Sequence, residues 1–136
     1  VTLGKLMRGV FPGFTQPNGL AVDQLSRDQA VVDAYIADPN VHDSLTAITG
    51  MSMLESGEFL DQYEGHFPVP LLLMHGGKDG ITSAQATREF AGRVKGEVEL
   101  EIWNELFHEI HNEPEQVLVL ERVVSWIEAR LVDLSK

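Results

Sequence analysis

The sequence has no cysteine, and its 10 basic side chains are outnumbered by 21 acidic ones. The absence of cysteine excludes disulfides, thiol nucleophiles and thiolate-bound metals, and it is compatible with any redox compartment. The formal net charge of −11 creates a field that repels nucleic acid and anionic lipid head groups. We therefore expect neither as a partner.

Long hydrophobic runs are also absent. The longest apolar run, residues 69–74, is far shorter than the roughly 20 residues that span a bilayer. The first residues show neither the charged start nor the cleavage site of a signal peptide, and Val1 stands where an initiator Met would. The composition, 43% hydrophobic and 23% charged, is typical of one soluble domain or part of one. We expect a soluble chain cut from something longer, with the cytoplasm as its compartment.

Residues 1–66 show helical patterns separated by short breaks. An apolar stripe predicts a helix over residues 3–11. A capping box that begins at Ser26 predicts a second helix, which continues to about Ala37. A third helix is predicted over residues 43–63, disturbed at one of its internal glycines.

Residues 67–136 alternate between strand and helix patterns. The apolar run at residues 69–75 lies between proline and glycine, which predicts a strand buried on both faces. A capping box at Thr82 opens a predicted helix, and Gly96 is placed to end it. Apolar residues then alternate with glutamates over residues 97–102, which predicts an edge strand with its glutamates in solvent.

The C-terminal segment completes this pattern with a predicted helix that packs through an apolar stripe. Its residues recur at steps of three and four: Val117, Leu120, Val124, Ile127 and Leu131. A crossover helix between two strands implies parallel pairing, and two parallel strands do not form a stable sheet alone. The rest of the sheet must come from another chain, from a second copy in a homo-oligomer, or from segments assigned here to helices.

Two loops follow the predicted strands, at residues 76–80 and 104–111. In open α/β sheets, ligands bind beyond the carboxyl ends of the strands, where such loops converge. The first loop carries Asp79 and the second carries His108. A carboxylate that meets an imidazole is the orienting pair of a nucleophilic triad, in which the acid fixes the tautomer of the base.

These loops also carry a family resemblance. Residues 69–79 resemble the late strand of α/β-hydrolases that presents the catalytic acid. Residues 106–113 resemble the histidine loop of the monoacylglycerol lipase and lysophospholipase group, in which a second histidine follows three positions later. Residues 20–66 resemble the helical cap of that group.

The resemblance implies an α/β fold: the C-terminal part of an α/β-hydrolase, with an incomplete sheet. Residues 1–66 would form the cap or lid, and residues 67–136 the last strands and helices of the core. Asp79 would be the catalytic acid and His108 the base. The substrates would be monoacylglycerol, lysophospholipid or similar carboxylic esters, with no metal or organic cofactor.

One part of the family pattern is missing. The group needs a G-x-S-x-G nucleophile elbow before this region and an oxyanion hole from an earlier loop. The nearest match, residues 50–54, lacks the second glycine and lies in a helical pattern, so Ser52 is a poor nucleophile candidate. The chain is therefore expected to supply the acid and base of an ester hydrolase without its nucleophile, and to be inactive alone. The missing N-terminal half would complete the sheet.

Other interpretations of the same residues remain open. Asp79 and His108 are also typical of ordinary turn and loop residues, and His111 is an alternative base. The motif from His108 to His111 is one residue too short for the zinc motif H-E-x-x-H. His75 with its two glycines resembles an esterase oxyanion loop, although no nucleophile elbow follows it.

Two further alternatives concern the whole chain. It could be a non-catalytic chain that folds by sharing its sheet with a partner or a second copy. It could also keep the fold and catalyse another hydrolysis, such as that of peptides, because a fold does not determine its chemistry.

Overall fold

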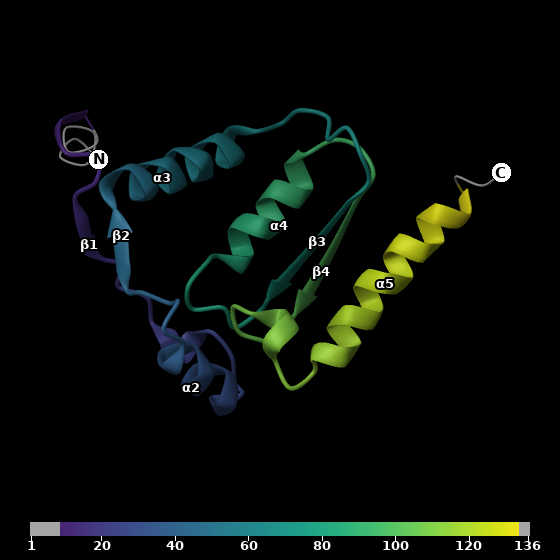
Figure 1. The fold of residues 1–136 in the computed structure, drawn as a ribbon. Helices are drawn as coiled ribbons and strands as arrows, with labels where there is room; N and C mark the ends of the chain where they lie inside the picture. Colours follow the sequence, from purple (N-terminus) through teal and green to yellow (C-terminus); the bar gives the residue numbers. More distant parts are fainter. Residues whose placement is uncertain (1–8, 134–136) are drawn as a thin grey trace.

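A computed structural model of the chain describes residues 9–133, which form an open arrangement of short elements (Figure 1). No helix among these residues is long and apolar enough to cross a membrane. The helix predicted over residues 3–11 lies largely outside the described residues. The elements, in chain order, are β1 (Thr15–Pro17), η1 (Val22–Gln24), α2 (Gln29–Ala37), β2 (Ser44–Thr46), α3 (Ala47–Gln62), β3 (Leu71–Gly76), α4 (Ala84–Arg93), β4 (Val98–Trp103), η2 (Ile110–Asn112) and α5 (Gln116–Asp133).

The second half of the chain is the predicted strand, helix, strand and helix. Strands β3 and β4 pair in parallel, with Leu71 opposite Val98 and Gly76 opposite Trp103. Helix α4 lies on one face of this pair and α5 on the other (Figure 1). Because the strands are parallel, their carboxyl ends lie at the same end of the sheet. The two predicted loops follow the strands there.

The first half differs from the prediction of helices alone. Strands β1 and β2 form a short antiparallel pair, with Thr15 opposite Thr46. The helix predicted over residues 43–63 therefore begins only at Ala47, after β2. Helix α3 then continues through Gly50 and Gly57 without a break. The cost of a helical glycine, about 1 kcal/mol relative to alanine, is too small to interrupt it.

The two predicted capping boxes are displaced. Asp28, not Ser26, caps α2, because its side chain accepts from the N–H of Ala30. The Ser26 hydroxyl instead donates to the carbonyl of Asn112, far away in the sequence. Ser83, one residue after Thr82, caps α4. Both helices are confirmed, but Ser26 makes a tertiary contact in place of a cap, and the Thr82 hydroxyl donates to Asp79 in its own loop.

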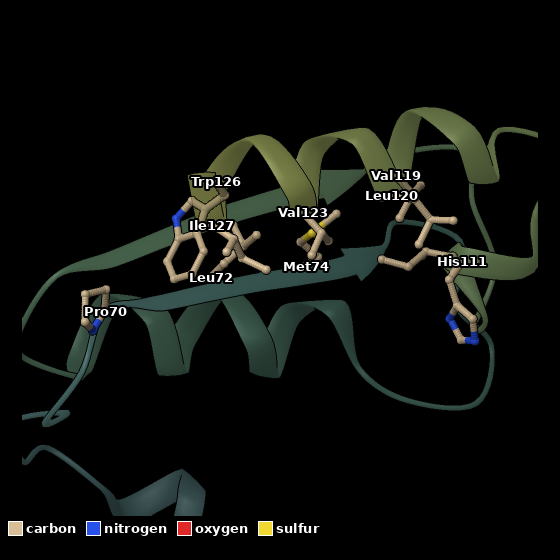
Figure 2. A pocket seen from close by; sticks show the side chains of 10 residues that line it. Pro70, Leu72, Met74, His111, Val119, Leu120, Val123, Trp126 and Ile127 are labelled. Carbon is tan, nitrogen blue, oxygen red and sulfur yellow. The ribbon is translucent and has the colours of Figure 1, made fainter. Parts of the chain in front are cut away.

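The packing of α5 was wrongly predicted. Its apolar stripe, the five residues given above, is between 45% and 61% exposed. Among residues 116–131 of the helix, only Val119 has a buried side chain. Between α5 and β3 lies an open apolar cavity of about 510 Å³, which Figure 2 shows from close by. It is lined by side chains of both elements, among them Leu72, Met74, Val123 and Trp126. Strand β3 is consequently half-exposed instead of buried on both faces.

The three glutamates at β4 are between 34% and 60% exposed, which agrees with the predicted solvated face, and they also form ion pairs. Glu99 and Glu101 both pair with Arg122 of α5. Glu97 pairs with Arg130, further along the same helix. Side chains alternate along a strand, so the same pattern that turns the apolar residues towards α4 turns the glutamates towards α5. These ion pairs join α5 to β4, on the face of the sheet where the apolar cavity lies.

The two glycines at the end of β3 allow the loops to approach each other. A Cβ at Gly76 would lie 1.9 Å from the carbonyl oxygen of Phe107, and one at Gly77 would lie 2.6 Å from Cα of Asn104. Backbone atoms of a neighbouring loop cannot yield as a flexible side chain can. The backbone of the histidine loop therefore crosses the end of β3 at a distance that only glycine permits.

We predict that Gly76→Ala lowers the free energy of unfolding by roughly 3 kcal/mol, because the new methyl group displaces the histidine loop. Gly92 in α4 is the matched control, since a Cβ there would meet no described atom within 4 Å. Gly92→Ala is expected to raise stability by up to about 1 kcal/mol. Urea unfolding of both variants measures the difference. Equal effects of the two substitutions would contradict a close contact at Gly76.

Candidate functional site

The structure brings the predicted acid and base together. Asp79 lies in the loop after β3, and its side chain is only 1% exposed. His108 lies in the loop after β4, and its side chain is 33% exposed. The Nδ1 atom of His108 is 2.9 Å from Oδ2 of Asp79. One side of the imidazole therefore contacts a buried carboxylate while the ring remains accessible.

The carboxylate of Asp79 is held by its own loop. Oδ1 accepts hydrogen bonds from the backbone N–H groups of Ile81 at 2.7 Å and Thr82 at 2.9 Å. Oδ2 accepts from the Thr82 hydroxyl at 2.6 Å. Burial alone would raise the pKa of Asp79, but the hydrogen bonds from Thr82, His108 and Ile81 outweigh it and lower that pKa to about 2. Asp79 is consequently ionised at neutral pH.

The loop that carries His108 is bound to the segment before α2. The N–H of His108 donates to the carbonyl of Gln24 at 3.3 Å, and the N–H of Glu109 donates to that of Leu25 at 2.8 Å. The two acceptors are the last residue of η1 and the residue that follows it, Leu25, whose side chain is buried. The histidine loop is thus anchored by residues more than 80 positions earlier in the chain.

Glu113 is a second anchor, which no pattern in the sequence indicated. Its side chain is fully buried and accepts a hydrogen bond from the N–H of Phe107 at 2.7 Å, immediately before His108. Its other oxygen lies 2.9 Å from Nε of Arg27, which also pairs with Glu115. The pKa of Arg27 is raised, above all by its hydrogen bond to Glu115. Arg27 therefore compensates a buried carboxylate next to the candidate base.

The other candidate residues lie apart from this pair, with one exception. His111 lines the cavity between β3 and α5, and Ser52 lies on the exposed side of α3. His75, at the end of β3, is the exception, because its Nε2 atom lies 3.0 Å from Oδ2 of Asp79. Among residues 9–133, no group of three or more histidine, cysteine or acidic side chains is arranged to hold a metal ion.

The geometry defines what the pair can do chemically. A charged carboxylate facing Nδ1 of His108 favours the tautomer that carries its proton there, which leaves Nε2 free to accept a proton. The same carboxylate stabilises the imidazolium that results. This arrangement suits a general base that later returns its proton as a general acid.

Comparison with known proteins identifies the family. The sequence profile of the family described as serine aminopeptidase, S33, matches residues 1–115. The monoacylglycerol lipase of Mycolicibacterium smegmatis is 39% identical over 133 residues, which cover 96% of this chain and 47% of that protein. A putative monoglyceride lipase of Schizosaccharomyces pombe is 26% identical over 125 residues, which cover 90% of this chain and 33% of that protein.

Two solved structures share the fold. The crystal structure of a Paleococcus ferrophilus monoacylglycerol lipase superposes with a TM-score of 0.75 at 27% identity, over 92% of this chain and 49% of the other. A soluble variant of the Saccharomyces cerevisiae monoglyceride lipase gives a TM-score of 0.79 at 18% identity, over 94% and 48% of the two chains.

The chain spans about half the length of these lipases. The described residues contain one two-stranded parallel sheet, with a helix on each of its faces (Figure 1). The expected fold class and the resemblance to monoacylglycerol lipases are confirmed. The chain belongs to the serine aminopeptidase S33 family of α/β-hydrolases.

Proposed function

We propose that this chain supplies the acid and base of a serine hydrolase that cleaves monoacylglycerols, lysophospholipids or similar carboxylic esters. The observation that carries the proposal is the contact of 2.9 Å between His108 Nδ1 and Oδ2 of Asp79. It occurs between the loops that follow two parallel strands, where an α/β-hydrolase presents these groups. The names of the lipase relatives support the choice of ester class.

In the proposed reaction, a serine outside this chain attacks the ester carbonyl. Nε2 of His108 removes the proton from the serine hydroxyl and later gives it to the leaving alcohol. Asp79 holds the imidazole in the required tautomer and stabilises its positive form. Water then hydrolyses the acyl-enzyme by the same exchange of protons, so that no metal or organic cofactor is needed.

The open apolar surfaces support a further part of the proposal. The exposed stripe of α5 and the cavity beside β3 are the surfaces that the rest of an α/β-hydrolase sheet would cover. We assign residues 1–66 to the cap and residues 67–136 to the core. The hydrogen bonds from the histidine loop to Gln24 and Leu25 then join the core to the start of the cap.

Two alternatives predict different behaviour. The family description favours peptide hydrolysis as a second candidate reaction, because the same triad cleaves amides and esters. The open edge of β3 favours a non-catalytic chain that pairs with a second copy. Three measurements distinguish these possibilities: hydrolysis of a monoacylglycerol, hydrolysis of an aminoacyl p-nitroanilide, and the mass of the chain in solution.

A hybrid lipase provides the direct test. Residues 1–136 would replace the matching segment of the Mycolicibacterium smegmatis monoacylglycerol lipase, so that the remainder of that enzyme supplies the nucleophile. We expect the hybrid lipase to hydrolyse monoacylglycerol. Asp79→Asn should lower kcat by roughly 10⁴ and His108→Ala by roughly 10⁶, because each removes one member of a triad.

His111→Gln is the matched control, since His111 lies in the cavity beside α5 and not at the carboxylate. It should leave kcat within a factor of about three. A folded hybrid lipase without ester hydrolysis would contradict the proposed function. Loss of activity in His111→Gln but not in His108→Ala would show that the base was wrongly assigned.

The depressed pKa of Asp79 predicts how stability depends on pH. Folded Asp79 remains ionised down to a pH of about 2, whereas the unfolded group takes up its proton near 3.8. The stabilisation is therefore present above about pH 4 and is lost as the pH falls towards 2. Thr82→Val removes the hydroxyl that binds Oδ2, so it should cost about 1 kcal/mol at pH 6 and less near pH 2.

Thr82→Ser keeps the hydroxyl and is the matched control. Urea unfolding at several pH values gives the free energies, and the ¹³C shift of the Asp79 carboxyl gives its pKa. The pKa should rise towards the ordinary value in Thr82→Val only. Identical pH profiles for the valine and serine variants would refute the assigned role of the hydroxyl.

A further inference from the structure

His75 lies behind the acid and base pair in a chain of polar contacts that the proposed mechanism does not use. Its side chain is largely buried and points towards α4. Nδ1 of the ring lies 2.8 Å from the Thr87 hydroxyl, and Nε2 lies 3.3 Å from the Thr82 hydroxyl. The Thr82 hydroxyl donates in turn to Oδ2 of Asp79.

The carboxylate itself determines where the proton of His75 is. Nε2 of His75 is 3.0 Å from Oδ2 of the ionised Asp79, where a bare nitrogen lone pair would be repelled. The ring proton therefore lies on Nε2. Nδ1 is then the acceptor, and the Thr87 hydroxyl donates to it.

The acceptor positions of Asp79 are already occupied. A carboxylate offers about four lone-pair positions. Two are used by backbone N–H groups on Oδ1, and the other two by the Thr82 hydroxyl and His108 on Oδ2. The Nε2 proton of His75 consequently goes to the oxygen of Thr82, not to Asp79 directly.

This contact fixes the direction of the Thr82 hydroxyl proton. The same oxygen is also 3.4 Å from Nδ1 of His108. Nδ1 of His108 carries the proton that faces Asp79, so it cannot accept a hydrogen bond from the hydroxyl. The Thr82 hydroxyl is therefore held towards Oδ2 of Asp79, with His75 as the donor to its oxygen.

We propose that His75 is a positioning residue, which orients the Thr82 hydroxyl towards Asp79 and thereby holds in place the carboxylate that faces His108. Thr87 holds the His75 ring in the orientation that this requires. The two histidines are then opposite tautomers on either side of one carboxylate: His75 with its proton on Nε2, and His108 with its proton on Nδ1. The catalytic importance of this arrangement rests on the proposed function, but the tautomers themselves do not.

The first test is ¹⁵N NMR of the histidine-labelled chain at about pH 8, where free imidazole is neutral. We expect His75 with a bare Nδ1 and a protonated Nε2, and the reverse in His108. Thr82→Val should shift the Nε2 signal of His75 and Thr82→Ser should not. A bare Nε2 in His75, the averaged signals of an unconstrained ring, or no response to Thr82→Val would each overturn the proposal.

The second test uses the hybrid lipase and separates orientation from packing. His75→Leu should lower kcat about tenfold with KM unchanged, and it should raise the pKa of the Asp79 carboxyl in the direction that Thr82→Val does. His75→Gln, which keeps a donor group near the position of Nε2, should restore most of kcat. In the Thr82→Val background, His75→Leu should have little further effect, because no hydroxyl remains to be oriented.

The result that would refute the proposed function differs from the result that would refute the assignment of His75. Opposite tautomers in a hybrid lipase that does not hydrolyse esters would refute the proposed function and support the assignment of His75. An active hybrid lipase in which His75→Leu leaves both kcat and the pKa of the Asp79 carboxyl unchanged would refute the assignment of His75 alone.

Discussion

The buried carboxylate of Asp79 is the constraint on which the site depends. A charge that is 1% exposed must be compensated, and here the donors come from the residues directly after it and from the loop of His108. The compensation requires the two loops to be close. That closeness in turn requires Gly76, where any side chain would collide with the carbonyl of Phe107.

The sequence predicted this centre because its signals are local. A leucine-rich run between proline and glycine predicts β3. Asp79 in the loop after β3 and His108 in the loop after β4 both lie at the carboxyl end of the parallel strands. Glu113 was missed because its role is a contact with Arg27, 86 residues away, which leaves no local pattern. The short strands β1 and β2 were missed for the same reason. The ion pairs of the β4 glutamates were missed because alternation shows that these side chains share a face, but not that Arg122 lies opposite.

The two faces of the β3–β4 pair differ in how completely they are covered. Helix α4 packs directly on one face, whereas α5 lies over an open apolar cavity (Figure 2). Ion pairs such as that of Arg122 with Glu101 join α5 to β4. Large exposed apolar patches in proteins often mark interaction surfaces. The sequence pattern predicted the apolar stripe of α5, but not that its residues are 45% to 61% exposed.

The most direct test of the account is a double-mutant cycle on Asp79 and His108 in the hybrid lipase. The measured quantity is kcat for Asp79→Asn, for His108→Ala and for the double variant. Because the acid acts only through the base, the double variant should lose no more than about what His108→Ala loses alone. Losses that multiply would show that the two side chains act independently, and would contradict the assignment of an acid and base pair.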